Sequence, residues 1–220
     1  MRSMRETMAY PDYTRAERIA DGIVHVVGIA ASVTGVVILL VAAIPNLDIL
    51  STSALAIYGA TVITLFSVSA SYHMVSHTGR KQVLRKFDQA AIFFKIAGTY
   101  TPLVILIGSA FAYGVLLFVW VAAIFGALAK FAFGHRLEGI TVGIFLVLGW
   151  ASLTLAWPIF DKMPFAVSML ILAGGLLYTI GVVFHRWHGL KFQNAIWHGF
   201  VLAASACHFV AVAAGTFTLA

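Results

Sequence analysis

Residues 20–45 read A-D-G-I-V-H-V-V-G-I-A-A-S-V-T-G-V-V-I-L-L-V-A-A-I-P, a stretch that is apolar over almost its whole length. A helix that crosses a bilayer needs about 20 predominantly apolar residues, so this segment is long enough to span one. Six more segments of the same kind follow along the chain: 51–75, 87–109, 111–133, 140–160, 164–185 and 194–218. The sequence therefore predicts an all-α, polytopic membrane protein with seven transmembrane helices.

The composition of the whole chain agrees with this prediction. Of its 220 residues, 61% are hydrophobic and 10% are charged, whereas a soluble domain carries about 25% charged residues. A soluble fold of this size cannot bury so much apolar surface, and a disordered chain needs the opposite composition. Cys207 is the single cysteine, which excludes a disulfide scaffold. We expect a polar, retained segment at residues 1–18 and one transmembrane domain at 19–220.

The basic residues indicate how the helices are oriented. Cytoplasmic loops of membrane proteins collect Lys and Arg. Twelve basic residues fall on one predicted side: Arg2, Arg5, Arg15, Arg18, Arg80, Lys81, Arg85, Lys86, Lys130, Arg136, Arg186 and Lys191. Lys162 alone falls on the other. We therefore expect a cytoplasmic N-terminus and an outside C-terminus in the plasma (inner) membrane. The formal net charge of +6 is explained by topology, without nucleic acid as a partner.

Ionisable and polar side chains inside the spans are costly and usually functional. Those near the predicted cytoplasmic leaflet are Glu17, Asp21, His25, Ser69, His73, Asp88, Asn194 and His198. His73, Asp88 and His198 come from three helices at one predicted depth, and their imidazoles and carboxylate suit Zn²⁺. Two alternatives stay open at this point. The histidines can be ordinary interfacial residues, and Asp88 can cap its helix or pair with Arg85.

Two further polar residues lie deeper in the predicted spans. Lys95 is seven residues past Asp88 on the same helix face, about 10 Å along the axis. Its ammonium must reach Asp88 or a bound water, or else line a wet cavity. His208 lies about 15 Å deeper than His198, so we expect a buried, hydrogen-bonded histidine that does not share a metal with His198. Gly98 and Gly174 are expected to let helices pack closely.

Four stretches carry a resemblance to a known family: E-R-I-A-D-G-I-V-H (17–25), S-A-S-Y-H (69–73), K-F-D-Q-A-A-I-F with I-A-G-T-Y-T-P (86–102), and N-A-I-W-H-G-F-V-L-A-A-S-A-C-H-F (194–209). Through essentially its whole length the chain resembles the bacterial hemolysin III proteins, relatives of the progestin and adipoQ receptors. The resemblance implies a seven-helix fold with its N-terminus inside. It also implies a zinc ion near the cytoplasmic side, bound by one histidine of helix 2 and by an H-x-x-x-H pair of helix 7.

The implied zinc ligands map onto this sequence with one departure. The helix 2 histidine is His73 and the second histidine of the pair is His198, but the first falls on Asn194. Either Asp88 or a water completes the site, or zinc binding is weakened or lost. The resemblance associates Asp88 and Ser69 with the zinc water. A second departure is Asp21, where relatives tend to carry asparagine. Asp21 is expected to support the site, together with Glu17, His25 and Lys95.

Three functions are weighed on this basis. The first is a zinc-dependent hydrolase of a lipid amide or ester, with Asp88 as general base and Ser69 assisting it. The second is a non-enzymatic, receptor-like or membrane-homeostasis protein with a structural metal. The third is a cytolytic pore-former. The long apolar helices argue against it, because they are typical of a protein that resides in the membrane. In each case membrane lipid is the expected partner.

Overall fold

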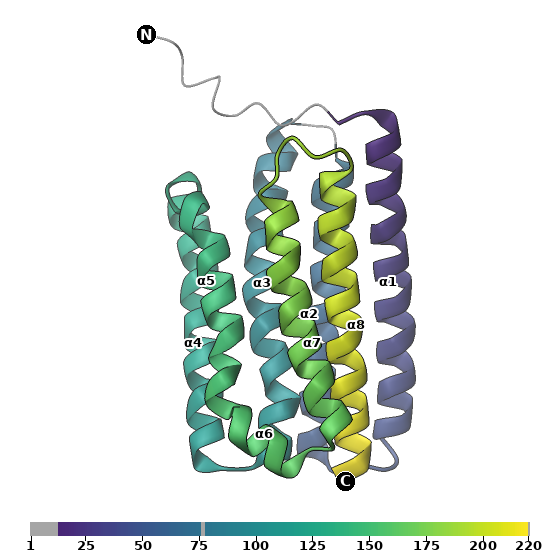
Figure 1. The fold of residues 1–220 in the computed structure, drawn as a ribbon, viewed down its shortest axis with the longest axis vertical. Coiled ribbons are helices and arrows are strands. Elements are labelled where there is room, and N and C mark those ends of the chain that lie inside the picture. Colours follow the sequence, from purple (N-terminus) through teal and green to yellow (C-terminus); the bar gives the residue numbers. More distant parts are fainter. Residues whose placement is uncertain (1–12, 76–77, 220) are drawn as a thin grey trace.

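The computed structural model describes residues 13–75 and 78–219, and these ranges contain helices and no strand. Figure 1 shows them as one upright bundle. The helices and 3-10 segments are α1 (Arg15–Ala43), α2 (Ile49–Met74), α3 (Thr78–Ile107), α4 (Ala110–Phe133), η2 (Gly134–Leu137), α5 (Glu138–Trp150), η3 (Ala151–Leu155), α6 (Ala156–Lys162), α7 (Phe165–His185) and α8 (Gln193–Leu219). Within the described residues seven helical stretches are long and apolar enough to cross a membrane. The predicted fold class is confirmed.

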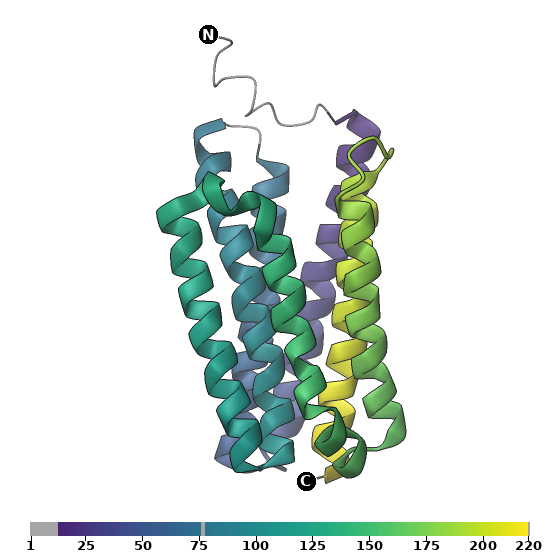
Figure 2. The ribbon, with the colours of Figure 1, turned by 60° about the vertical axis from the view of Figure 1, so that its left-hand side comes forward.

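The helices run side by side (Figures 1 and 2), and the most extensive contacts join α1 to α2, α2 to α3, α3 to α4 and α7 to α8. We call the end at which α1, α3 and α8 begin the N-terminal end of the bundle, and the opposite end the C-terminal end. α1 packs against both α2 and α8, which brings the first and last helices together. α3 contacts α2, α4, α5, α6 and α8 and is the most buried of the spans. Lys95, Thr99 and Thr101 on α3 are accordingly buried in the protein interior.

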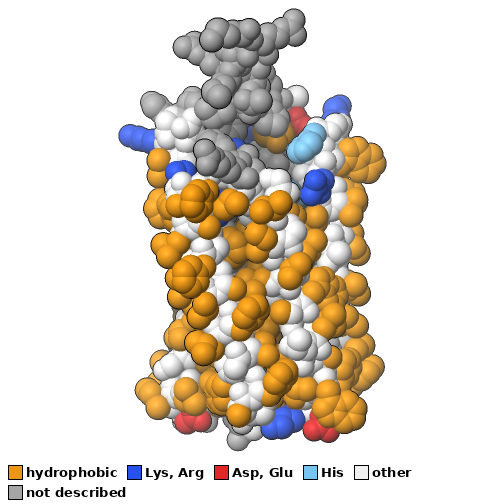
Figure 3. All heavy atoms as spheres, turned by 90° about the vertical axis from the view of Figure 1, so that its left-hand side faces the viewer, with side chains coloured by type: hydrophobic (Ala, Val, Ile, Leu, Met, Phe, Trp, Pro, Cys, Tyr) orange, Lys and Arg blue, Asp and Glu red, His pale blue; other side chains and the backbone are white. Residues whose placement is uncertain are grey.

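The outer surface of the bundle is apolar along its length. On the face seen in Figure 3, hydrophobic side chains cover the middle, while charged side chains gather at the two ends. Large side chains such as Trp157 and Val147 are 81% and 75% exposed. Exposed apolar surface on this scale is unfavourable in water but suits contact with lipid tails. The surface thus agrees with seven spans and a bilayer around them.

The start of α1 is held by a capping box. The hydroxyl of Thr14 accepts a hydrogen bond from the backbone N–H of Glu17, and Glu17 in turn accepts one from the N–H of Thr14. The second carboxylate oxygen of Glu17 accepts the N–H of Phe192, which precedes α8 and has a φ of 59°. Glu17 therefore satisfies orphan backbone donors and joins the start of α1 to the loop before α8. It orders the N-terminal end of the bundle.

The fifth predicted span, residues 140–160, is not one continuous α-helix. It is built from α5, the 3-10 segment η3 and the short helix α6. Pro158 has no N–H to bond to the carbonyl of Thr154, and its ring collides with that carbonyl in a regular α-helix. A 3-10 turn over residues 151–155 avoids the collision and lets Pro158 lie in the first turn of α6, where proline is tolerated. The break redirects the chain at the C-terminal end.

Gly98 allows α2 and α3 to approach closely, as the sequence predicts. A Cβ atom at this position would lie 2.2 Å from Oγ1 of Thr61 on α2. The Thr61 hydroxyl is held by its hydrogen bond to the carbonyl of Tyr58, and its β-branched side chain has little rotamer freedom in a helix. The Thr61 side chain therefore cannot move away from a Cβ at position 98 unless the backbone of α2 or α3 shifts.

We expect Gly98→Ala to lower the free energy of unfolding by about 1–3 kcal/mol, the usual cost of overpacking. Thermal unfolding of the purified protein in detergent measures the effect. Gly114→Ala is the matched control, because a Cβ there meets no atom within 4 Å and alanine is the better helix former. Equal melting temperatures for the two variants would show that α2 and α3 do not pack this closely.

Candidate metal centre

The site begins on one face of α1. Asp21 and His25 lie one turn apart, and their exposed fractions are 4% and 2%. The Nδ1–H of His25 donates to the backbone carbonyl of Asp21 at 2.8 Å. A carbonyl can only accept, so the proton is on Nδ1 and Nε2 is left as an acceptor. Nε2 lies 3.3 Å from Oγ of Ser69, which therefore donates to it and links α1 to α2.

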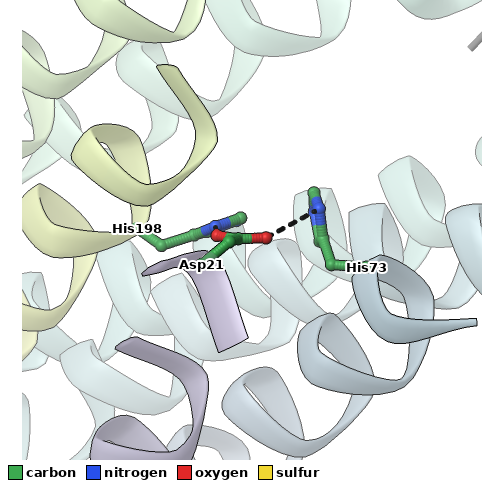
Figure 4. A group of neighbouring side chains, drawn as sticks. All are labelled: Asp21, His73 and His198. Carbon is green, nitrogen blue, oxygen red and sulfur yellow. Dashed lines mark hydrogen bonds and ion pairs between the residues drawn. The ribbon is translucent and has the colours of Figure 1, made fainter. Parts of the chain in front are cut away.

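Asp21 also lies between two further histidines, His73 at the end of α2 and His198 in the second turn of α8 (Figure 4). Nδ1 of His198 is 2.6 Å from Oδ1 of Asp21, and Nδ1 of His73 is 3.5 Å from Oδ2. Each of the three residues offers one ligand atom, and these atoms lie within 4.8 Å of one another. Asp21, His73 and His198 thus form a group that can hold a metal ion. We call it the Asp–His cluster.

The donor atoms of the Asp–His cluster fit a zinc ion. Two imidazoles and one carboxylate make up a ligand set found in catalytic zinc sites, where three protein ligands leave a fourth position open. The carboxylate of Asp21 is buried, and a buried charge is stable only when paired or bound to a metal. The neighbouring imidazoles are close together, with 4.4 Å between the ring centroids of His73 and His198. A cation at this place would compensate the Asp21 charge.

The structure distributes the residues that the sequence singled out over four places. His73 and His198 meet, and the residue that meets both is Asp21, which the sequence assigned a supporting role. Asn194 is at the edge, with its Nδ2 3.5 Å from Nδ1 of His73. Asp88 lines the adjoining cavity near Ser69 and His198. Glu17 caps α1, away from the Asp–His cluster.

The sequence contained a signal for the place of Asp21. The resemblance implies an asparagine at position 21 and a histidine at position 194, and this chain departs from it at both. The fold places the two residues around His73: Asp21 as an ion-pair partner and Asn194 at hydrogen-bonding distance. One departure removes a candidate ligand and the other supplies one, so the pair of departures would have favoured Asp21 over Asp88 or a water as the third candidate ligand.

The Asp–His cluster opens on an internal cavity of about 530 Å³. Its lining runs from Tyr13 and His73 near the N-terminal end to Ile159 and Phe160 of α6 near the other end. Most of the lining is apolar, and α3, α5, α7 and α8 all contribute. Burial raises the pKa of Tyr13, which lines the cavity, above its usual value of 10.0, so its phenol stays neutral. A volume of this size accepts a small molecule or an acyl chain.

The structure combines apolar helices long enough to cross a membrane with a buried Asp–His cluster and an internal cavity. These features define a class of multi-pass helical membrane proteins in which a possible metal site lies among the helices. The chain belongs to the haemolysin-III-related family, whose model matches residues 14–209. It is 31% identical over 201 residues to a Hemolysin-3 homolog of Bacillus subtilis (strain 168), which covers 91% of this chain and 94% of the relative.

Two other relatives extend the comparison. Hemolysin-3 of Bacillus cereus is 31% identical over 210 residues, covering 95% of this chain and 96% of the relative. The monocyte to macrophage differentiation factor of Homo sapiens is 32% identical over 167 residues, covering 71% of this chain and 67% of the relative. The human relative supports the kinship with the progestin and adipoQ receptors.

Proposed function

We propose that this protein is a zinc-dependent hydrolase that cleaves an amide or ester bond of a membrane lipid. One observation carries the proposal. A donor set of two imidazoles and a carboxylate lies at the end of a largely apolar cavity, inside a bundle of membrane-spanning helices. A catalytic zinc site needs an open ligand position, and a lipid substrate needs an apolar channel that begins within the membrane. Both needs are met at the same place.

In this proposal Asp21, His73 and His198 hold the zinc ion. Zinc, when bound, polarises a carbonyl and lowers the pKa of its water. His25 does not act as a ligand, because its Nδ1–H donates to the Asp21 carbonyl and its Nε2 accepts from Ser69. It positions Asp21 on α1 and Ser69 on α2 instead. Hydrogen bonds of this kind orient the ligands of a metal site.

Asp88 is the general base of the proposed reaction. Its carboxylate lines the cavity beside Ser69 and near His198, and it accepts a proton at Oδ from the attacking water. Ser69 also lies within hydrogen-bonding reach of the Asp88 carboxylate, so its single proton is shared between the ionised Asp88 and Nε2 of His25. Once Asp88 carries the proton, the Ser69 proton turns to Nε2 of His25 and Oγ accepts from the protonated carboxyl. Ser69 thereby holds Asp88 in position until the proton passes to the leaving group.

We also propose that the site faces the cytoplasmic leaflet of the plasma (inner) membrane. The basic residues support this orientation, since the positions with most Lys and Arg lie at the same end of the bundle as the Asp–His cluster. A lipid of that leaflet reaches the cavity from the side, with its acyl chain among the apolar lining residues.

Removal of the metal tests the hydrolase directly. Purified protein in detergent is assayed for zinc content and for release of fatty acid from a panel of N-acyl and O-acyl lipids. We expect close to one zinc per chain, loss of hydrolysis after chelation, and recovery when zinc is added back. His198→Ala should not recover, because it lacks a ligand. Its hydrolysis should stay at least about 100-fold below that of the parent protein.

Two outcomes would favour the other functions. A protein that binds zinc stoichiometrically and cleaves no lipid of the panel would contradict the hydrolase and favour a receptor-like protein with a structural metal. The names of the Bacillus relatives contain the word hemolysin, so the same preparation is added to erythrocytes. Lysis at nanomolar protein, retained by His198→Ala, would favour a cytolytic function that does not use the metal.

A further inference from the structure

The middle of the cavity contains a buried lysine that the proposed hydrolysis does not use. Lys95 lies on α3, is 4% exposed, and lines the cavity. Its Nζ lies 4.5 Å from the ring centroid of Tyr178 on α7, a cation–π distance. The side chain thus does not extend to the bundle end to reach water. Of the alternatives left open by the sequence, the structure shows the one in which Lys95 lines a cavity.

Within the part of the chain that the structure describes, the ammonium of Lys95 has no counter-charge at ion-pair distance. No carboxylate of the described residues forms an ion pair with it. Asp88 is seven residues earlier on the same helix, about 10 Å along the axis. A buried charge is ordinarily paired, and an aromatic face compensates it only in part. The position therefore favours an anion that the protein itself does not provide.

Three other side chains complete a polar patch around Lys95, which we call the Lys95 subsite: Tyr178 of α7, and Ser205 and His208 of α8. The hydroxyls of Tyr178 and Ser205 are 2.7 Å apart, and the rings of Tyr178 and His208 have centroids 5.8 Å apart. Nε2 of His208 donates to the carbonyl of Ile171 at 3.3 Å, as expected for a buried, hydrogen-bonded histidine. A carbonyl can only accept, so Nε2 carries a proton, and in the neutral imidazole Nδ1 is then an acceptor.

Two features indicate that the side chains of the Lys95 subsite are arranged to hold a ligand. His208 fits against α7 because position 174 is glycine, where a Cβ would lie 2.5 Å from the imidazole. Nδ1 of His208 is buried without a hydrogen-bond partner among the described residues. Buried polar atoms are nearly always satisfied, and Nδ1 of this tautomer is an acceptor, so the orphan indicates a water that donates to it. The second hydrogen of such a water can be donated to an anion beside Lys95. Side chains from α3, α7 and α8 thus converge on one positive charge and one hydration site.

We propose that the Lys95 subsite binds the carboxylate of a single-chain amphiphile, such as a fatty acid, whose apolar chain lies along the cavity. The charge of the subsite is that of Lys95 alone, which matches a monoanion. Phosphate monoesters carry up to two negative charges, and the next cation of the cavity lining on α3, Arg85, is ten residues away, about 15 Å. The largely apolar lining suits an alkyl chain. The proposal does not depend on zinc or hydrolysis.

Photo-crosslinking locates the carboxylate end. The probe is palmitate with a diazirine on its third carbon, added to the full-length protein in detergent and mapped by mass spectrometry. We expect labelled residues on α3, α7 and α8 around Lys95, Tyr178 and Ser205, and stronger competition by unlabelled palmitate than by hexadecanol. Labels on α1 and α2 beside Asp21 and His73 would overturn the proposal, because they would place the carboxylate at the Asp–His cluster.

Substitution of the lysine tests its role. Lys95→Met should weaken palmitate binding at least tenfold and leave hexadecanol binding unchanged, while Lys95→Arg should retain palmitate. Lys191→Met, which removes an exposed lysine, is the matched control and should bind as the parent does. Equal palmitate affinity in Lys95→Met and the parent, or tighter binding of hexadecyl phosphate than of palmitate, would refute the carboxylate assignment.

The fatty-acid subsite and the zinc hydrolase can be refuted independently of each other. Zinc content is measured in Lys95→Met and should equal that of the parent, because Lys95 is not one of the residues of the Asp–His cluster. Removing an unpaired buried charge is not expected to unfold the protein. If the variant nevertheless does not fold, the crosslinking map of the parent protein decides the question alone.

Discussion

Asp21→Asn should empty the metal site. The substitution keeps the size of the side chain but replaces an anionic ligand by a neutral amide oxygen, between imidazoles whose Nδ1 atoms lie 2.6 and 3.5 Å from the carboxylate. Loss of residues that merely orient a metal ligand costs about 10–100-fold in affinity, so loss of a ligand should cost at least about 100-fold. Zinc per chain, measured after gel filtration, should fall from about one to below about one tenth.

Asp161→Asn is the matched control for this experiment. Asp161 is exposed on α6, at the C-terminal end of the bundle, and the same chemical change there should leave zinc content unaltered. Thermal unfolding gives a second readout. A bound metal stabilises the folded state, so added zinc should raise the melting temperature of the parent and of Asp161→Asn, but not that of Asp21→Asn. Full zinc occupancy in Asp21→Asn would show that Asp21 is not a ligand.

Asn194→His should restore the site that Asp21→Asn empties. Residue 194 is one turn before His198 on α8, and its amide nitrogen is 3.5 Å from Nδ1 of His73. An imidazole in this position completes the H-x-x-x-H pair that the family resemblance implies. In the Asp21→Asn background we expect zinc occupancy to return to close to one per chain, with an affinity at least about tenfold above that of Asp21→Asn alone.

The single variant Asn194→His gives an independent check on the same geometry. With Asp21 present, a third imidazole adds a fourth protein ligand and closes the position that catalysis needs. Zinc should then bind more tightly while hydrolysis falls. If the double variant stays as empty as Asp21→Asn, position 194 cannot reach the metal. The exchange of Asp21 and Asn194 would then not be compensatory.

The helices were predictable because membrane insertion depends on local properties. Hydropathy and length locate all seven spans, from residues 20–45 to residues 194–218, and the structure has a helical stretch at each. The start of the third span was placed too late, at residue 87, because the first turns of α3 (Thr78–Ile107) are polar. The break in the fifth span was missed, although Pro158 was its signal. A proline in an apolar segment is accommodated in more than one way, and packing at the end of the bundle selects among them.

The candidate site was predictable in part, for a related reason. Polar residues are scarce in the spans, so His73 and His198 stood out from the sequence, and helical spacing placed Asp21 and His25 on one face. The sequence did not determine which carboxylate lies beside the two histidines. Asp21 and Asp88 lie at similar depths on different helices, and the choice depends on how α1 and α3 are rotated about their axes. That rotation is decided by contacts such as α1 with α8, which no local pattern records.

By itself, the sequence determined the helices, their number and the set of polar groups buried among them, because each of these depends on residues near one another along the chain. The tertiary structure alone decided that Asp21 joins His73 and His198, and that Lys95 meets Tyr178 in place of Asp88. The physical reason is the same in both cases. A ligand set or a binding subsite consists of side chains from several helices, and only the packing of those helices determines which of them face one another.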